Sequence, residues 1–199
     1  MKVSVLTRKD VRDLSVIAGG LEVLDWVLYD TLSIATGAVT QLRFFQQATG
    51  QAGITLEKTN MELPGQLPAG YKFVIQKLVA TPRIGLALTG ALVKDMVAVT
   101  HRGYAQLMIG TRPYLQCPLI NLIGGAFQGF FGTAVGGTLL EQGYVAPRTI
   151  VNGELEYSPA IPANFTFSVQ VGYDTAPTVS ATTDLCIQAV GKLIRPRQG

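Results

Sequence analysis

The chain has 199 residues, of which 48% are hydrophobic and 15% charged, and its formal net charge at pH 7 is +3. The length fits a single domain, the apolar content excludes disorder over most of the chain, and the small net charge excludes a protein that binds nucleic acid mainly through a basic surface. Soluble domains typically carry about 25% charged residues. We therefore expect much of the surface to be covered by copies of the chain, a partner or lipid. A small enzyme with a large core is the alternative.

The N-terminal region, residues 1–25, predicts an arm or a short amphipathic helix ahead of one main domain, residues 26–199. The apolar stretch before Arg8 is too short for a signal peptide. This predicts synthesis in the cytoplasm.

From Trp26 onward the sequence predicts short β-strands. The first two cover WVLYDTLSIA, residues 26–35, and QLRFFQQ, residues 41–47. A third covers YKFVIQKLVA, residues 71–80. Its alternation falters at Gln76 and Lys77, which indicates a β-bulge or an edge strand.

Between the second and third strands, residues 59–70 (TNMELPGQLPAG) have the composition of a rigid loop. The two prolines restrict the residues before them to extended backbone, and Gly65 and Gly70 allow the chain to reverse. Thr59 and Asn60 are expected to bond their own backbone at a turn. The loop should direct the third strand into the core, with Phe73 and Ile75 pointing inward, and should contact a neighbouring subunit through Met61, Leu63, Pro64 and Pro68.

One amphipathic helix is predicted over LALTGALVKDMVAV, residues 86–99, because its large apolar side chains recur at helical spacing. The strand YAQLMIG follows it. The single histidine, His101, lies where the helix gives way to this strand, which is typical of a turn or capping residue and not of a catalytic one.

Residues 113–140 contain no charged side chain and six glycines. The length could span a bilayer, but the glycines and prolines make a poor membrane helix. We interpret GGAFQGFFGTAVGG within it as a flexible apolar loop that a neighbouring subunit covers. The chain's own core and a membrane face are the alternatives. Aromatic side chains bury the most area at interfaces, so the expected anchors are Phe127, Phe130 and Phe131.

The last third shows the clearest β pattern. In NFTFSVQVGY every odd position from Phe165 to Tyr173 is apolar, and DLCIQAVGKLI keeps Leu185, Ile187, Ala189 and Leu193 on one face. Seven or eight short, mostly antiparallel strands with one helix predict an all-β fold, an antiparallel β-sandwich.

The sequence offers little that could perform chemistry. No Cys or His spacing matches a zinc site, and no glycine-rich motif matches a phosphate-binding loop. Glu154 and Glu156 share a strand face, which is typical of a solvated stripe and less often of a glycosidase pair or of cation ligands. Cys117 and Cys186 lie in apolar contexts, where free buried thiols are expected. We predict no catalysis, no cofactor and no metal.

Several short strings together resemble one protein family. They are YDTLSI, RFF, TNM…PGQLPAGYKFVI, IGTRPYLQCPL and GKLIRPRQ, spread over most of residues 26–198. This combination resembles single jelly-roll capsid proteins of tail-less icosahedral bacteriophages, including lipid-containing ones.

The resemblance implies a jelly roll of two four-stranded sheets in a self-assembling shell. The implied partners are copies of the chain, other virion proteins and, in lipid-containing particles, the inner membrane, with no sequence-specific nucleic-acid binding. The implied location is the virion, after synthesis in the host cytoplasm. Because the chain is short for a double jelly roll, the shell needs a partner protein or extra copies.

Two other functions stay open from the sequence. One is a β-sandwich module of a phage particle that binds a receptor or carbohydrate, although only one tryptophan, Trp26, is available as an aromatic platform. The other is an enzyme with a site around His101, Glu154 or Glu156.

Overall fold

The computed structural model describes residues 5–7, 21–83, 90–123, 131–135, 138–142, 155 and 157–197. Over these ranges the chain is mostly β-strand, and every pair of named strands is antiparallel. One α-helix and two short 3-10 helices, Gln51–Gly53 and Leu119–Leu122, complete the described elements. The predicted all-β class with antiparallel sheets and one short helix is confirmed, and the arrangement is consistent with a β-sandwich.

The larger sheet has five strands in the order β1-β10-β5-β13-β2. Their bounds are Val5–Thr7, Tyr157–Pro162, Lys72–Arg83, Thr183–Pro196 and Leu21–Ile34. β2 and β13 are 14 residues long and pair over their whole length, so these strands are not short. β2 forms one edge of the sheet and begins at Leu21, ahead of the predicted domain start at Trp26.

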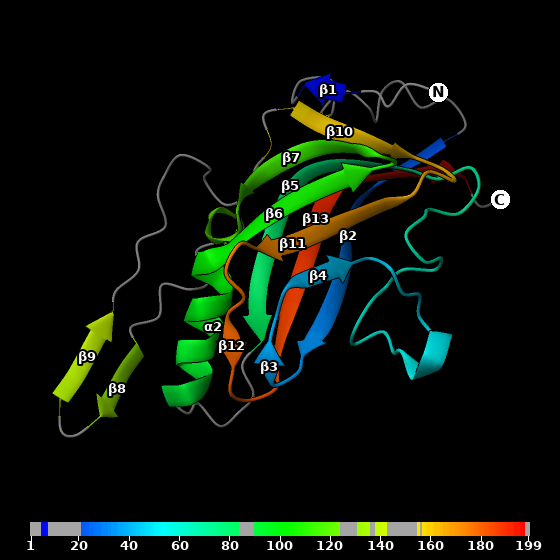
Figure 1. Cartoon of the computed structure of the whole chain (residues 1–199). Helices are drawn as coiled ribbons and strands as arrows, with labels where there is room; N and C mark the ends of the chain where they lie inside the picture. The colour runs from blue at the N-terminus through cyan, green and yellow to red at the C-terminus, as the bar shows by residue number, and fades with distance from the viewer. Residues whose placement is uncertain are drawn as a thin grey trace.

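The second sheet has four strands in the order β4-β11-β6-β7. Their bounds are Gln41–Phe44, Phe167–Tyr173, Gly103–Ile109 and Arg112–Pro118. Two small sheets pair β3 (Gly37–Ala38) with β12 (Thr178–Val179) and β8 (Phe131–Val135) with β9 (Thr138–Gln142). Figure 1 shows the two main sheets as two layers, with β4, β11 and β6 in front of β5, β13 and β2.

The core lies between these layers and takes alternate residues from β11 and β13, as their period-two patterns predict. One apolar cluster joins both sheets. From the four-stranded sheet it includes Phe44, Leu107, Phe167, Val169 and Val171, and from the five-stranded sheet Phe73, Ile75, Leu78, Leu185 and Ile187. Phe73 and Ile75 are fully buried, as expected for residues that follow the proline-rich loop.

The falter at Gln76 and Lys77 is a β-bulge. Val190 of β13 pairs with Lys77, whereas the next residue, Gly191, pairs with Ile75, so Gln76 is the extra residue on β5. β5 lies between β10 and β13, so of the two readings the bulge is confirmed and the edge strand is wrong.

The helix, α2, runs over Gly90–Arg102, a few residues later than predicted; residues 86–89 lie outside the described residues. Its Asp95 carboxylate is 5% exposed. It accepts hydrogen bonds from the Ser180 backbone N–H at 2.7 Å, the Ser180 hydroxyl at 2.6 Å and the Ala181 N–H at 3.1 Å. This contact ties the helix to the connection between β12 and β13.

Candidate subunit interface

The loop over residues 54–71 covers part of the free edge of β2. The Asn60 side chain accepts a hydrogen bond from the Tyr29 N–H at 2.9 Å and donates one to the Val27 carbonyl at 2.7 Å. The Thr31 N–H donates to the Lys58 carbonyl at 2.8 Å. Asn60 therefore bonds the strand edge, and the prediction that it bonds its own backbone is wrong. Its side-chain amide offers a donor and an acceptor, as the backbone of a paired strand would.

A buried carboxylate lies beneath this loop. Asp30 is 2% exposed and accepts a hydrogen bond from the backbone N–H of Phe45. Phe45 has a φ of 66°, a left-handed conformation that costs energy for a side chain of this size, and its ring is fully buried. Burial raises the pKa of Asp30 above its usual 3.8, while the bonds to Phe45 and Thr59 act in the opposite direction.

The two proline-glycine turns hold the rest of the loop against β11. Gly65 and Gly70 have φ values of 63° and 82°, the conformations predicted for chain reversal. The Gly65 carbonyl accepts a hydrogen bond from the Phe167 N–H at 2.8 Å, and the Tyr71 N–H donates to the Pro68 carbonyl at 3.1 Å. The loop thus has a defined geometry, fixed by backbone bonds at both turns.

The four interface candidates of this loop occupy different environments. Met61 is 2% exposed and belongs to the core, so it anchors the loop instead of facing a neighbour. Leu63 is 41% exposed and Pro64 is exposed, whereas Pro68 is half-buried and lines a pocket. Leu63 and Pro64 are therefore the members of this set that are exposed.

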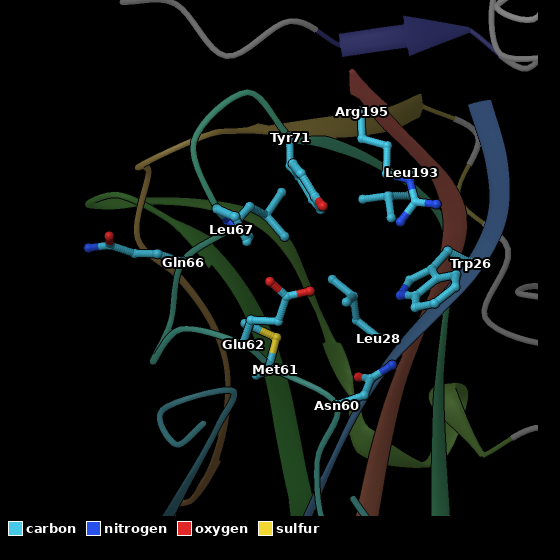
Figure 2. A pocket seen from close by; sticks show the side chains of 11 residues that line it. Trp26, Leu28, Asn60, Met61, Glu62, Gln66, Leu67, Tyr71, Leu193 and Arg195 are labelled. Atoms are coloured by element: carbon cyan, nitrogen blue, oxygen red, sulfur yellow. The ribbon is translucent and has the colours of Figure 1, made fainter. Parts of the chain in front are cut away.

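The pocket beside this loop lies between the loop and the first half of β2 (Figure 2). Trp26 and Arg195 line one side, Leu67 and Tyr71 line the other, and Glu62 extends toward the middle. Its volume is about 80 Å³, far below the roughly 300–1,000 Å³ of small-molecule sites. It has room for a protruding side chain or a few waters, and not for a sugar or cofactor.

Exposed apolar side chains gather around the same edge. Six large hydrophobic residues are exposed in the described part of the chain, and five of them lie on β2 or on the loop: Leu21, Trp26, Val27, Leu56 and Leu63. Of the β2 members, Leu21 lies in the predicted arm because the prediction begins the first strand at Trp26, whereas Trp26 and Val27 lie in the predicted strand. Glu22, Val23, Leu24 and Asp25 do not alternate between polar and apolar residues, so their pattern does not indicate a strand.

The glycine-rich segment is in part a hairpin. β8 and β9 pair with each other, so the prediction of a flexible loop over residues 124–137 is wrong for residues 131–135. Phe131 begins β8 and pairs with Gln142. Phe127 and Phe130 lie outside the described residues, so their role as interface anchors stays a prediction.

Of the three residues considered for chemistry, His101 lies in the described part of the chain. His101 lies at the end of α2, where its Nδ1 is 3.0 Å from the Val97 carbonyl, as expected for a capping residue. Glu154 and Glu156 lie outside the described residues. In the described ranges, no cluster of His, Cys, Asp and Glu could hold a metal ion, and no helix has the length and apolarity to cross a bilayer.

Comparison with known proteins finds no match to a family model, to a curated protein or to a solved structure.

Proposed function

We propose that the chain is a capsid protein with a single jelly-roll domain, which assembles with copies of itself into an icosahedral shell and performs no catalysis. The virion is then its location, and other virion proteins are its further partners.

The observation that carries this proposal is the nesting of the strand pairs. Eight strands make up the two main sheets once the three-residue β1 is set aside. In chain order, the first pairs with the last (β2 with β13), the second with the seventh (β4 with β11), the third with the sixth (β5 with β10), and the two middle strands with each other (β6 with β7).

This nesting is what results when one long antiparallel hairpin is wrapped around a core. The contacts of β13 with β5 and of β11 with β6 then join the wrapped pairs into two sheets. Jelly rolls have eight strands in two such sheets and are common in viral capsids and lectins. The strand order supports the jelly-roll fold. Because one fold serves many functions, the choice between a capsid protein and a binding module depends on the surface.

The surface favours assembly. The exposed apolar residues concentrate along one edge and its adjoining loop, and the chain has few charges. Concentrated apolar surface is typical of a protein–protein contact. The receptor- or carbohydrate-binding alternative is less favoured, because the pocket beside Trp26 is too small for a sugar ring.

Electron microscopy of the purified full-length chain, at increasing concentration and across ionic strengths, tests the proposal. We expect closed shells or curved fragments of uniform thickness. A chain that stays monomeric under all conditions contradicts the proposed function. Specific binding to a glycan array by such a monomer would favour the binding module instead.

A further inference from the structure

The first half of β2 is a strand edge whose outer side pairs with none of the described strands. The bonds of Tyr29 and Thr31 to the loop show that odd-numbered residues of β2 direct their backbone groups away from β13. β2 and β13 pair without a register shift from Ile34 to Leu21, so the same holds at Leu21, Val23 and Asp25. Among the described residues, no partner bonds these three backbone groups.

This open edge is apolar. Leu21, Trp26 and Val27 are 45%, 40% and 39% exposed. Exposed, unpaired and apolar strand edges associate with other strands, and proteins usually protect them with charge or proline. β2 has no proline between residues 21 and 34.

The two acidic residues on the edge do not protect it, because each is paired within the chain. Glu22 accepts a hydrogen bond from Arg195 Nε at 2.8 Å, and Asp25 lies 2.6 Å from Lys192 Nζ. Both basic residues lie on β13, directly opposite their partners. The charge that would repel an incoming strand is thus partly offset at both positions, and least at Asp25, whose side chain is 84% exposed.

We propose that residues 21–27 of β2 pair antiparallel with the same residues of a second copy, around a two-fold axis at Leu24. The proposal rests on the proposed function and names the contact through which two subunits join their five-stranded sheets. Main-chain bonds at the outward-facing positions supply the association, as in β-strand addition.

The extent of the open edge and the charges on it select this register. An axis at Glu22 or Asp25 places two like charges directly opposite each other, which is unfavourable. An axis at Val23 pairs only residues 21–25 of the described edge. An axis at Leu24 pairs residues 21–27 and keeps the carboxylates apart, because Asp25 lies opposite the partner's Val23 and Trp26 lies opposite the partner's Glu22, whose neighbour is the partner's Arg195.

The loop limits how far the pairing extends. Asn60 already bonds the Val27 carbonyl, so pairing at Val27 relies on its N–H, and the loop covers the edge from Tyr29 to Thr31. An axis beyond Leu24 toward the C-terminal half of β2 would drive the partner's strand into this loop. The covered half and the open half together define where the second copy fits.

Disulfide trapping tests the register. Leu24 faces the partner's Leu24 as a non-hydrogen-bonded pair, with Cα atoms about 4.5 Å apart, which lies within disulfide range. We expect Leu24→Cys to form a covalent dimer on mild oxidation. The matched variant Val23→Cys should not, because it faces the partner's Asp25. The native thiols of Cys117 and Cys186 are 7% and 0% exposed and give little background.

A second pair of variants tests the backbone bonds without cysteine. Asp25→Pro removes an outward N–H that β13 does not use, while Asp25→Ala loses the same ion pair and keeps the N–H. We expect Asp25→Pro to raise the concentration needed for assembly at least tenfold relative to Asp25→Ala. Equal assembly of the two variants overturns the proposal.

The outcomes separate this contact from the proposed function. If shells form but Leu24→Cys does not cross-link, or Val23→Cys cross-links instead, the pairing around Leu24 is wrong and the proposed function stands. If Leu24→Cys cross-links efficiently in a protein that never forms shells, the pairing stands and the proposed function is wrong.

Discussion

Gly191 of β13 packs directly against the backbone of Val74 in β5: a Cβ at residue 191 would lie 1.9 Å from the Val74 carbonyl oxygen. The close approach occurs at the bulge, where Gln76 is the extra residue. Only glycine fits here, so one position on β13 fixes the register of two central strands.

Gly191→Ala should therefore destabilise the fold severely, by more than about 3 kcal/mol, since backbone must move to relieve the clash. Urea denaturation measures the loss. Gly53→Ala is the control, because Gly53 has open space around it and a φ of 79°, so it should lose only about 1–2 kcal/mol of dihedral strain. Similar losses in both variants would show that the contact with Val74 is not the constraint.

The buried carboxyl of Asp30 should make stability depend on pH. Its pKa is raised above 3.8 in the folded chain, mainly by burial. The folded state then holds the proton more tightly, so the contribution to stability is complete below 3.8 and is lost as the pH rises through the raised value. The unfolding free energy of Asp30→Asn relative to the native chain should therefore increase from about pH 4 to pH 7. A difference that is constant with pH, or that decreases, would contradict this.

Removing the Asp95 acceptor should loosen α2 from the connection between β12 and β13. Asp95→Ala leaves the Ser180 and Ala181 donors without this acceptor, which should cost about 2–3 kcal/mol. Asp95→Asn keeps one acceptor oxygen and should lose less. Chemical denaturation compares the two, and equal losses would mean that the bonds to Ser180 and Ala181 contribute little.

The two cysteines should be inert in the folded chain. Both are free and buried, as the sequence predicts. Burial raises the pKa of Cys117 to about 11, so at pH 8 only about one thiol in a thousand is the reactive thiolate. A thiol reagent should label neither residue in native conditions and both in denaturant. Rapid native labelling would show that the core opens easily.

Leu63 should contribute to assembly, whereas Met61 should contribute to folding. Leu63→Asp places a charge on exposed apolar surface and should raise the assembly threshold about tenfold, equivalent to 1.4 kcal/mol, with an unchanged circular dichroism spectrum. Met61→Asp buries a charge in the core and should prevent folding. Light scattering against concentration measures the threshold. A Leu63→Asp chain that assembles normally would remove the loop from the interface.

Regular alternation made much of the fold predictable. The inward faces of β11 and β13 are confirmed because their apolar residues repeat every second position, with Gly191 taking one such position of β13 at the bulge. The bulge itself was visible at Gln76 and Lys77, although its cause was not, because Gly191 is more than a hundred residues away along the chain.

The interface was less predictable because it depends on distant pairs. From the sequence, Glu22 is interpreted as a solvated charge and Asn60 as a turn residue. In the fold, Glu22 bonds Arg195 and the Asn60 amide bonds Tyr29. Met61 and Leu63 are two residues apart and equally apolar, yet one is buried and the other exposed. Sequence pattern identified the loop, and only the fold separates its inner from its outer side.

Sedimentation velocity of the full-length chain across a wide concentration range tests the central claim most directly. A self-assembling shell protein should change, above a threshold concentration, from a 21.3 kDa species to particles of far greater and uniform mass. A single 21.3 kDa species at every concentration and salt condition would contradict the claim.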